Sequence, residues 1–149
     1  GDTIVDSYTY GTIIGGMNKT PTLSVKFERQ VDFVGGASVV AKHIRKAGAT
    51  TKISSVLGND TLKDFVVNDL KSQDIQCDLV IDKTRPTTQK NVIVAGGYRL
   101  LKLDKVDNRA ISERVLERFK QSLSQSKADA FVFSDFRHGI FIYKRINFR

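Results

Sequence analysis

The sequence predicts an α/β fold in which helices flank a mainly parallel sheet. Two amphipathic segments, around residues 38–47 and 62–70, alternate with apolar runs of strand-like composition at residues 51–57 and 76–81. A chain that repeats strand, helix and strand in this order favours parallel strand pairs with right-handed crossovers. Its 149 residues, 40% of them hydrophobic, suffice for one packed domain or part of one.

The first helix is expected to follow a glycine pair. Gly35 and Gly36 stand between a strand-like run and a helical pattern of small apolar residues that stops at Gly48. We predict a helix over residues 38–47, because Gly48 suits the left-handed position at a helix end. Two glycines before a helix let backbone N–H groups approach a polar ligand at the positive end of the helix dipole. An ordinary strand-to-helix turn is the alternative.

The alternating pattern then continues. We predict a strand over residues 51–57, a helix that starts near Leu62 and ends near Asp74, and a strand over residues 76–81. The only cysteine, Cys77, falls in this last strand and is expected to be a small buried thiol. One cysteine allows neither a disulfide framework nor a paired-cysteine metal site, which favours a reducing, cytoplasmic location.

Two segments, residues 22–27 and 90–104, interrupt this alternation. Gly96-Gly97 lies at the centre of the second segment and separates two strand-like runs. A two-residue glycine turn supplies the positive φ angles that tight hairpins require, so the segment predicts a hairpin. These strands either form a small sheet of their own or extend the main sheet.

A helix and a short strand are the last predicted elements. Five apolar residues recur at helical spacing around an expected N-cap at Ser112: Ile111, Val115, Leu116, Phe119 and Leu123. The apolar run at residues 130–134 predicts a strand that ends at Ser134-Asp135. Open α/β sheets bind ligands at the carboxyl ends of their parallel strands, so Asp135 is a candidate site residue. Capping of a following helix is the alternative role for Asp135.

The charge of the chain does not point to nucleic acid. The formal net charge is +8, but the basic residues are scattered, with Lys42, Arg45 and Lys46 on one helix. Nucleic-acid binding is therefore a disfavoured hypothesis. It predicts salt-dependent binding of the chain to any duplex. No apolar run approaches the roughly 18 residues that a membrane span needs, and no signal-peptide pattern heads the chain, so we expect no membrane association.

Eight stretches, taken in order, resemble the amino-terminal half of the ribokinase or PfkB family of carbohydrate kinases, and among these the heptose-phosphate kinase branch. They are GDTIVDSYTYG (1–11), TPTLSVKF (20–27), GGASVVAKHIRKAGA (35–49), SSVLGND (54–60), DIQCDLV (74–80), RPTTQKNVIV (85–94), LLKLD (100–104) and SDFRHG (134–139). The resemblance implies a ribokinase-like fold of which residues 1–149 are the sugar-binding part. It also implies lid strands at about residues 22–33 and 90–104, which cover the sugar and often pair with a second subunit's lid.

The resemblance also implies a sugar site. Asp6 would hold sugar hydroxyls, Gly35 and Gly36 would present their backbone to the sugar, and Asp60 would line the same pocket. Fixed carboxylates suit this task because they accept the hydroxyl protons of a polyol.

Lys90 and Lys102 are expected to face an anionic group of the substrate from the lid, with ordinary solvent-exposed lysines as the favoured alternative. The two histidines, His43 and His138, lack a third ligand at suitable spacing, so we expect no metal site. Ser134, His138 and Asp135 lie too close in sequence for a catalytic triad.

One family segment does not occur in the chain. Family members carry a G-A-G-D segment in their second half, whose Asp is the general base for the sugar hydroxyl, and these 149 residues contain no such segment. We therefore expect a fragment, cut at both ends, of a kinase that uses ATP and Mg²⁺, with no catalytic residue and little or no kinase activity of its own. A noncatalytic phosphosugar-binding or dimerisation module is the alternative.

Three departures from the family pattern bear on the substrate. Val39 stands where the family often has Asn, Gly15-Gly16-Met17-Asn18 replaces a basic residue and a Ser-Pro-Glu-like turn, and His138 replaces a Lys. From these we expect a sugar or sugar phosphate other than the usual heptose. Fusion of the parent protein to a nucleotidyltransferase domain is one option.

Overall fold

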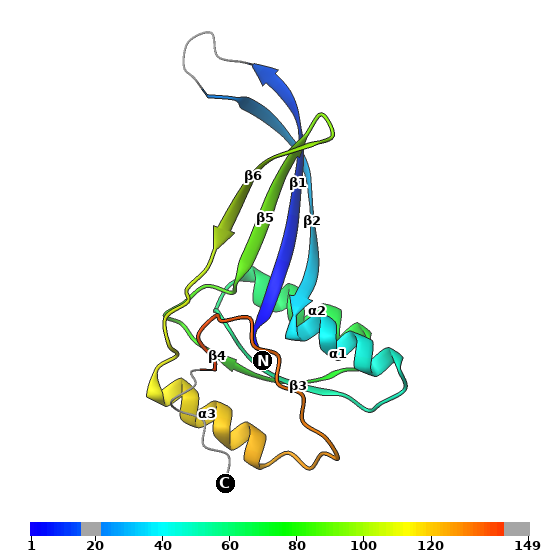
Figure 1. Ribbon diagram of the computed structural model, residues 1–149, viewed down its shortest axis with the longest axis vertical. Helices are drawn as coiled ribbons and strands as arrows, with labels where there is room; N and C mark the ends of the chain where they lie inside the picture. The colour runs from blue at the N-terminus through cyan, green and yellow to red at the C-terminus, as the bar shows by residue number, and fades with distance from the viewer. Residues whose placement is uncertain (16–21, 142–149) are drawn as a thin grey trace.

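A computed structural model describes residues 1–15 and 22–141, so Met17 and Asn18 lie outside the described residues. In chain order the elements are β1 (Thr3–Gly15), β2 (Ser24–Gly36), α1 (Ala37–Lys46), β3 (Lys52–Leu57), α2 (Thr61–Ser72), β4 (Gln76–Ile81), β5 (Gln89–Ala95), β6 (Tyr98–Lys105) and α3 (Glu113–Ser124). Figure 1 shows a long twisted sheet of β1, β2, β5 and β6 that projects from a compact part containing β3, β4 and the three helices.

The projecting sheet has the strand order β2-β1-β5-β6. Strand β1 is antiparallel to β2 and parallel to β5, and β5 is antiparallel to β6. The predicted hairpin is confirmed: β5 and β6 are joined by Gly96 and Gly97, whose φ angles are 57° and 81°. The sequence left open whether these strands form a sheet of their own, and the structure shows a sheet separate from the β3–β4 pair. Strand β1, one of the two central strands of that sheet, was not predicted from the sequence.

The compact part contains the predicted parallel pair. Strands β3 and β4 are parallel and joined through α2, as the alternation predicted. The other predicted crossover is wrong in its pairing, because the strand before α1 is β2, which belongs to the projecting sheet. Helix α1 therefore links the two sheets, and the fold is mixed rather than uniformly parallel.

Two apolar clusters cover the two faces of the β3–β4 pair. One packs α1 and α2 against β3 and the base of the projecting sheet: Val5, Val34, Ala37, Ala41, Ile53, Leu57, Val66, Leu70 and Ile75. The other packs α3 against the opposite face: Val56, Val80, Ile111, Val115, Leu116, Phe119 and Ile140. Because neighbouring strand residues point to opposite faces, Val56 and Leu57 serve different clusters. The half-buried Cys77 packs against the first cluster, and burial raises the pKa of its thiol.

The predicted strand over residues 130–134 is wrong, because the structure assigns no strand there. Asp2 N–H donates to Ser134 O (3.0 Å), which is a single backbone hydrogen bond between this segment and the start of β1. One such bond does not make the repeated ladder that defines a strand. Phe131 and Val132 are instead exposed.

None of the helices in the described ranges has both the length and the apolar character that crossing a bilayer would require.

Candidate functional site

One face of the projecting sheet carries most of the predicted site residues, and we call it the inner face. Directly paired residues of neighbouring strands share a face, and alternate residues along a strand return to it. The row nearest the compact part consists of Phe33, Asp6, Lys90 and Asp104. The second row consists of Val31, Tyr8, Val92 and Lys102, and the third of Arg29, Tyr10, Val94 and Arg99.

Asp6 stands at the centre of the first row. Its carboxylate is half-buried and has no hydrogen-bond or ionic partner among the residues that the structure describes. A Cβ atom at Gly35 would overlap Asp6 Oδ2, so the glycine leaves the space that the carboxylate fills. A partly desolvated acceptor without a protein partner is suited to bind the hydroxyl groups of a ligand.

Gly36 has a conformational role at the same strand end. Its φ of 59° lies in the left-handed region, and a side chain there would overlap Asp2 O. This turn lets β2 pass directly into α1, where Ala37 N–H donates to Asp2 O (2.7 Å). The first free N–H of the helix is thus occupied by the chain itself, and contact between this backbone and a sugar stays a prediction.

The segment of residues 135–139 lies against the base of the inner face. Asp2 lies an even number of residues before Asp6 and so is on the side of the chain that leads into the inner face. Its Oδ2 accepts hydrogen bonds from Phe136 N–H (2.8 Å) and His138 N–H (3.3 Å). Two residues of the first row act on the pKa of His138 through their charges: Lys90 lowers it and Asp104 raises it. The structure therefore places His138 within electrostatic range of Lys90 and Asp104, which share the first row with Asp6.

Within this segment, Asp135 and His138 have local partners. Asp135 Oδ1 accepts from Arg137 N–H (2.8 Å) and closes a turn, and no helix follows it within residues 136–141. The Asp135 cap on a following helix is therefore not formed. His138 Nδ1 bonds Asn108 Oδ1 (2.7 Å), and burial lowers the pKa of His138 below its usual value. Asp135 and His138 are thus bonded to Arg137 and Asn108, and no hydrogen bond of the described residues joins their side chains to each other or to that of Ser134.

Asp60 is engaged in the structure of the chain. Its Oδ1 accepts from Lys63 N–H (3.2 Å) as the N-cap of α2, and its Oδ2 accepts from Thr87 N–H (2.9 Å). Burial on its own would raise the pKa of the Asp60 carboxyl, but the hydrogen bonds from Thr87 and Lys63 outweigh it and hold the pKa below its usual value. These contacts account for Asp60 without a ligand, and its place in a sugar pocket stays a prediction.

The two lid lysines differ in their surroundings. Lys90 is half-buried in the first row, between Asp6 on β1 and Asp104 on β6. Lys102 lies one row further out, is exposed, and forms an ion pair with Asp104 (3.1 Å). Lys90 therefore adjoins Asp6 directly, whereas the charge of Lys102 is partly compensated by Asp104.

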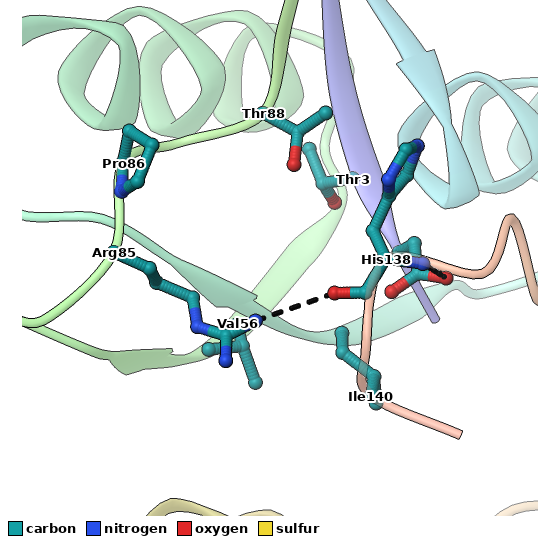
Figure 2. A pocket seen from close by; sticks show the side chains of 8 residues that line it. Thr3, Val56, Arg85, Pro86, Thr88, His138 and Ile140 are labelled. Carbon is teal, nitrogen blue, oxygen red and sulfur yellow. Dashed lines mark hydrogen bonds between the residues drawn. The ribbon is translucent and has the colours of Figure 1, made fainter. Parts of the chain in front are cut away.

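Arg85 was not singled out from the sequence, although it begins one of the matched stretches. Its side chain is only 9% exposed and pairs with Asp82 (3.0 Å). Its guanidinium also donates to the carbonyl oxygens of Arg109 (3.0 Å), Ala110 (3.1 Å) and His138 (3.3 Å), the last shown in Figure 2. Arg85 thus ties the approach to β5, the segment before α3 and the His138 segment together. A basic residue before a proline gives no sequence signal for this role.

The hollows of the surface do not outline a sugar pocket. The cavity in Figure 2, lined by residues that include Asp2, Arg85 and His138, has a volume of about 10 Å³, which is room for one water molecule. A hollow of about 700 Å³ lies elsewhere, between α1, β3, α3 and residues 125–134, and none of the predicted site residues lines it. Neither of these two hollows is lined by Asp6, Lys90 or Lys102.

The described residues offer no metal centre. Within residues 1–15 and 22–141, no group of three or more His, Cys, Asp or Glu side chains could hold a metal ion.

Comparison with known proteins places this geometry in a family. The model of the pfkB family carbohydrate kinases matches residues 2–140. The bifunctional protein HldE of Sulfurimonas denitrificans is 29% identical over 143 residues, which cover 94% of this chain and 30% of that protein. HldE of Proteus mirabilis is 28% identical over 141 residues, which cover 93% of this chain and 29% of that protein. The chain thus spans about three-tenths of the length of these curated relatives.

Solved structures show the same fold. Phosphofructokinase-2 from Escherichia coli in complex with fructose-6-phosphate has a TM-score of 0.62 and 17% identity, and the match covers 86% of this chain and 40% of that one. Ribokinase from Cryptococcus neoformans var. grubii in complex with ADP has a TM-score of 0.55 and 17% identity, with 74% and 34% covered. The fold is therefore ribokinase-like, and the chain corresponds to part of that domain.

Proposed function

Because the chain belongs to the pfkB family of carbohydrate kinases, we propose that the protein to which it contributes transfers a phosphoryl group from ATP to a hydroxyl of a sugar or sugar phosphate. In this proposal the chain supplies the sugar-binding part, with Asp6 as the residue that accepts hydrogen bonds from sugar hydroxyls. The strands at residues 22–33 and 90–104 supply the lid.

The half-buried carboxylate of Asp6 carries this proposal. It fills the space next to Gly35, and Asp6 pairs with Lys90 across β1 and β5. In the part of the chain that the structure describes, the carboxylate has no hydrogen-bond or ionic partner. An acceptor with no protein partner, next to a cation, suits a polyol, because its oxygens are available to the hydroxyl groups of the ligand. Gly35, Gly36, Lys90 and Asp135 complete the proposed site, with Asp60 and Lys102 at its margins.

Phosphoryl transfer needs charge stabilisation in addition to sugar binding. ATP and Mg²⁺ would supply the transferred group and part of the neutralising charge. We propose that these 149 residues contain no catalytic base and do not catalyse the transfer alone.

A dimerisation module is the second candidate function, and one observation favours it. Leu101 and Leu103 lie on the face of the sheet opposite Asp6 and are 59% and 60% exposed. Exposed apolar side chains on neighbouring rows are suited to an interface. We propose that the lid of a second copy covers them in a homodimer. A sedimentation coefficient that stays that of a monomer at all concentrations would count against this candidate.

The sugar-binding proposal is tested by calorimetric titration of the chain with free and monophosphorylated fructose and sedoheptulose. We expect Asp6→Asn to weaken binding of a sugar and of its phosphate alike, because both lose the same acceptor. The matched control is Asp64→Asn, because Asp64 is an exposed carboxylate on α2. This variant should bind the sugars as the unaltered chain does. Equal binding by Asp6→Asn and Asp64→Asn would refute the role of Asp6.

A further inference from the structure

The segment of residues 135–139 is docked on the rest of the chain around His138. The backbone N–H of His138 donates to Asp2 Oδ2 (3.3 Å), and its carbonyl oxygen accepts from Arg85 (3.3 Å). Its ring nitrogen Nδ1 bonds Asn108 Oδ1 (2.7 Å). The three partners precede β1, β5 and α3, so one residue joins this segment to three separate parts of the fold.

Two residues with positive φ angles flank His138. Arg137 has a φ of 62°, in the left-handed region that residues other than glycine rarely adopt, and Gly139 has a φ of 90°. A Cβ atom at Gly139 would overlap Arg109 O, and Ile111 N–H donates to Gly139 O (3.0 Å). The docked conformation is therefore held by its contacts against the backbone preference of Arg137.

The imidazole ring of His138 has one nitrogen with a partner and one without. Asn108 Oδ1 only accepts hydrogen bonds, so Nδ1 carries the proton and Nε2 of the neutral ring is an acceptor. Nε2 is buried and has no hydrogen-bond partner among the described residues. A proton added to Nε2 would create a buried positive charge and a buried N–H group without an acceptor, and both disfavour the docked segment.

The charged groups around the ring do not offset this cost. Four charged side chains act on it: Asp2, Asp104, Asp135 and Lys90. The carboxylates favour a positive charge on the ring and the lysine opposes it, but burial outweighs the carboxylates and lowers the pKa of His138. The guanidinium of Arg85, which faces the His138 carbonyl oxygen, is paired with Asp82. The docked segment thus favours the neutral ring.

We propose that residues 135–139 form a pH-sensitive latch, which is docked while His138 is neutral and is released when His138 is protonated. The contacts that carry this proposal are independent of the sugar site. The released segment exposes an ordinary histidine, whereas the docked one has a lowered pKa. Docking is therefore strongest above the ordinary histidine pKa of about 6.5 and weakens as the pH falls from there toward the lower, docked value.

Amide hydrogen exchange measured by NMR tests the latch in the unaltered chain. The reporters are Phe136 N–H, which donates to Asp2 Oδ2 (2.8 Å), and Ile111 N–H, which donates to Gly139 O. We expect their protection factors to fall between pH 7.5 and pH 5, by up to about tenfold for each pH unit below 6.5. The amides of α2 should stay better protected than the reporters at each pH, because release of the latch is local.

His138→Gln is the test variant, and His43→Gln is the matched control, because His43 is the other histidine and is exposed on α1. Glutamine can still bond Asn108 but does not titrate. The pH dependence of the reporters should be clearly smaller in His138→Gln and unchanged in His43→Gln. Burial lowers the pKa of the Gly1 amino group to about 6, but this group titrates alike in all three proteins, so its effect cancels in the comparison.

A titration of the His138 ring by NMR needs no substitution, and its pKa should lie below the ordinary value of about 6.5. Four results would overturn the inference: a ring that titrates at or above that value, reporter protection that stays constant from pH 7.5 to pH 5, a pH dependence that persists unchanged in His138→Gln, or reporters as well protected as the amides of α2 at every pH.

Discussion

The carboxylate of Asp6 occupies the space that a side chain at position 35 would need. Gly35 pairs with Ile4 on β1, next to Asp6, and a Cβ atom built on it overlaps Asp6 Oδ2. The φ angle of Gly35 is not in the left-handed region, so steric room for the carboxylate, rather than backbone conformation, explains the glycine. The Gly35-Gly36 pair therefore combines two separate requirements, since Gly36 supplies the positive φ.

Gly35→Ala is expected to displace the Asp6 carboxylate. The obstructing atom is the end of a side chain that can rotate away, so we expect a small loss, at most about 1 kcal/mol, in the free energy of unfolding. Urea unfolding measures this loss. In an Asp6→Ala background the same substitution should cost clearly less, because the obstructing oxygen is gone. Additive costs in this double-mutant cycle would show that the two residues do not compete for space.

Arg85→Met is expected to be strongly destabilising. The substitution leaves Asp82, whose side chain is 4% exposed, as a buried carboxylate without its cation, and it also removes the Arg85 hydrogen bonds to four carbonyl oxygens. Loss of one partner of a buried pair costs about 3–5 kcal/mol in unfolding free energy. Thermal or urea unfolding should show this cost, and Asp82→Leu combined with Arg85→Met should recover part of it.

Arg109→Gln provides the comparison for Arg85. Arg109 also pairs with an aspartate, Asp107, but its side chain is 79% exposed, so water replaces the lost contact. The unfolding midpoint of Arg109→Gln should stay close to that of the unaltered chain. A similar loss of stability in both variants would show that the buried contacts of Arg85 contribute no more than the exposed pair of Arg109.

Much of the local structure followed from sequence periodicity. The helix predicted over residues 38–47 is α1, Ala37–Lys46, and the N-cap predicted at Ser112 accepts a hydrogen bond from Val115 N–H. These features depend on residues within a few positions of one another, which a single sequence displays directly. The long strand β1 escaped prediction because polar residues occupy both of its faces, as with Asp6 and Ser7, which hides the alternation.

The arrangement of the candidate site depends on strand register, which the sequence does not display. Asp6 meets Lys90 only because β1 and β5 pair in one particular register, and a shift of one residue would place Lys90 on the opposite face. The row that joins Asp6 to Asp104 likewise needs two strand pairings at once. The position of Arg99 over Tyr8 likewise depends on the bulge between Ile93 and Val94.

Acid should weaken the fold partly through Asp60. Its pKa is held below the usual value in the folded chain, so near pH 4 the folded state binds fewer protons than the unfolded state. The stabilisation from Asp60 is therefore fully present above the ordinary carboxyl pKa and is lost as the pH falls through the lower, folded value. Urea midpoints measured between pH 6 and pH 2.5 should fall with decreasing pH.

Asp60→Asn isolates this contribution. Asparagine still caps α2 through its carbonyl oxygen but cannot accept from both Lys63 N–H and Thr87 N–H, and it does not titrate. The variant should thus be less stable than the unaltered chain at pH 6, and the difference should shrink toward pH 2.5. Asp82, whose pKa is also lowered, retains its own acid dependence in both proteins, so the midpoint of the variant still falls, but less steeply. A constant difference across the range would mean that the Asp60 charge has no part in stability.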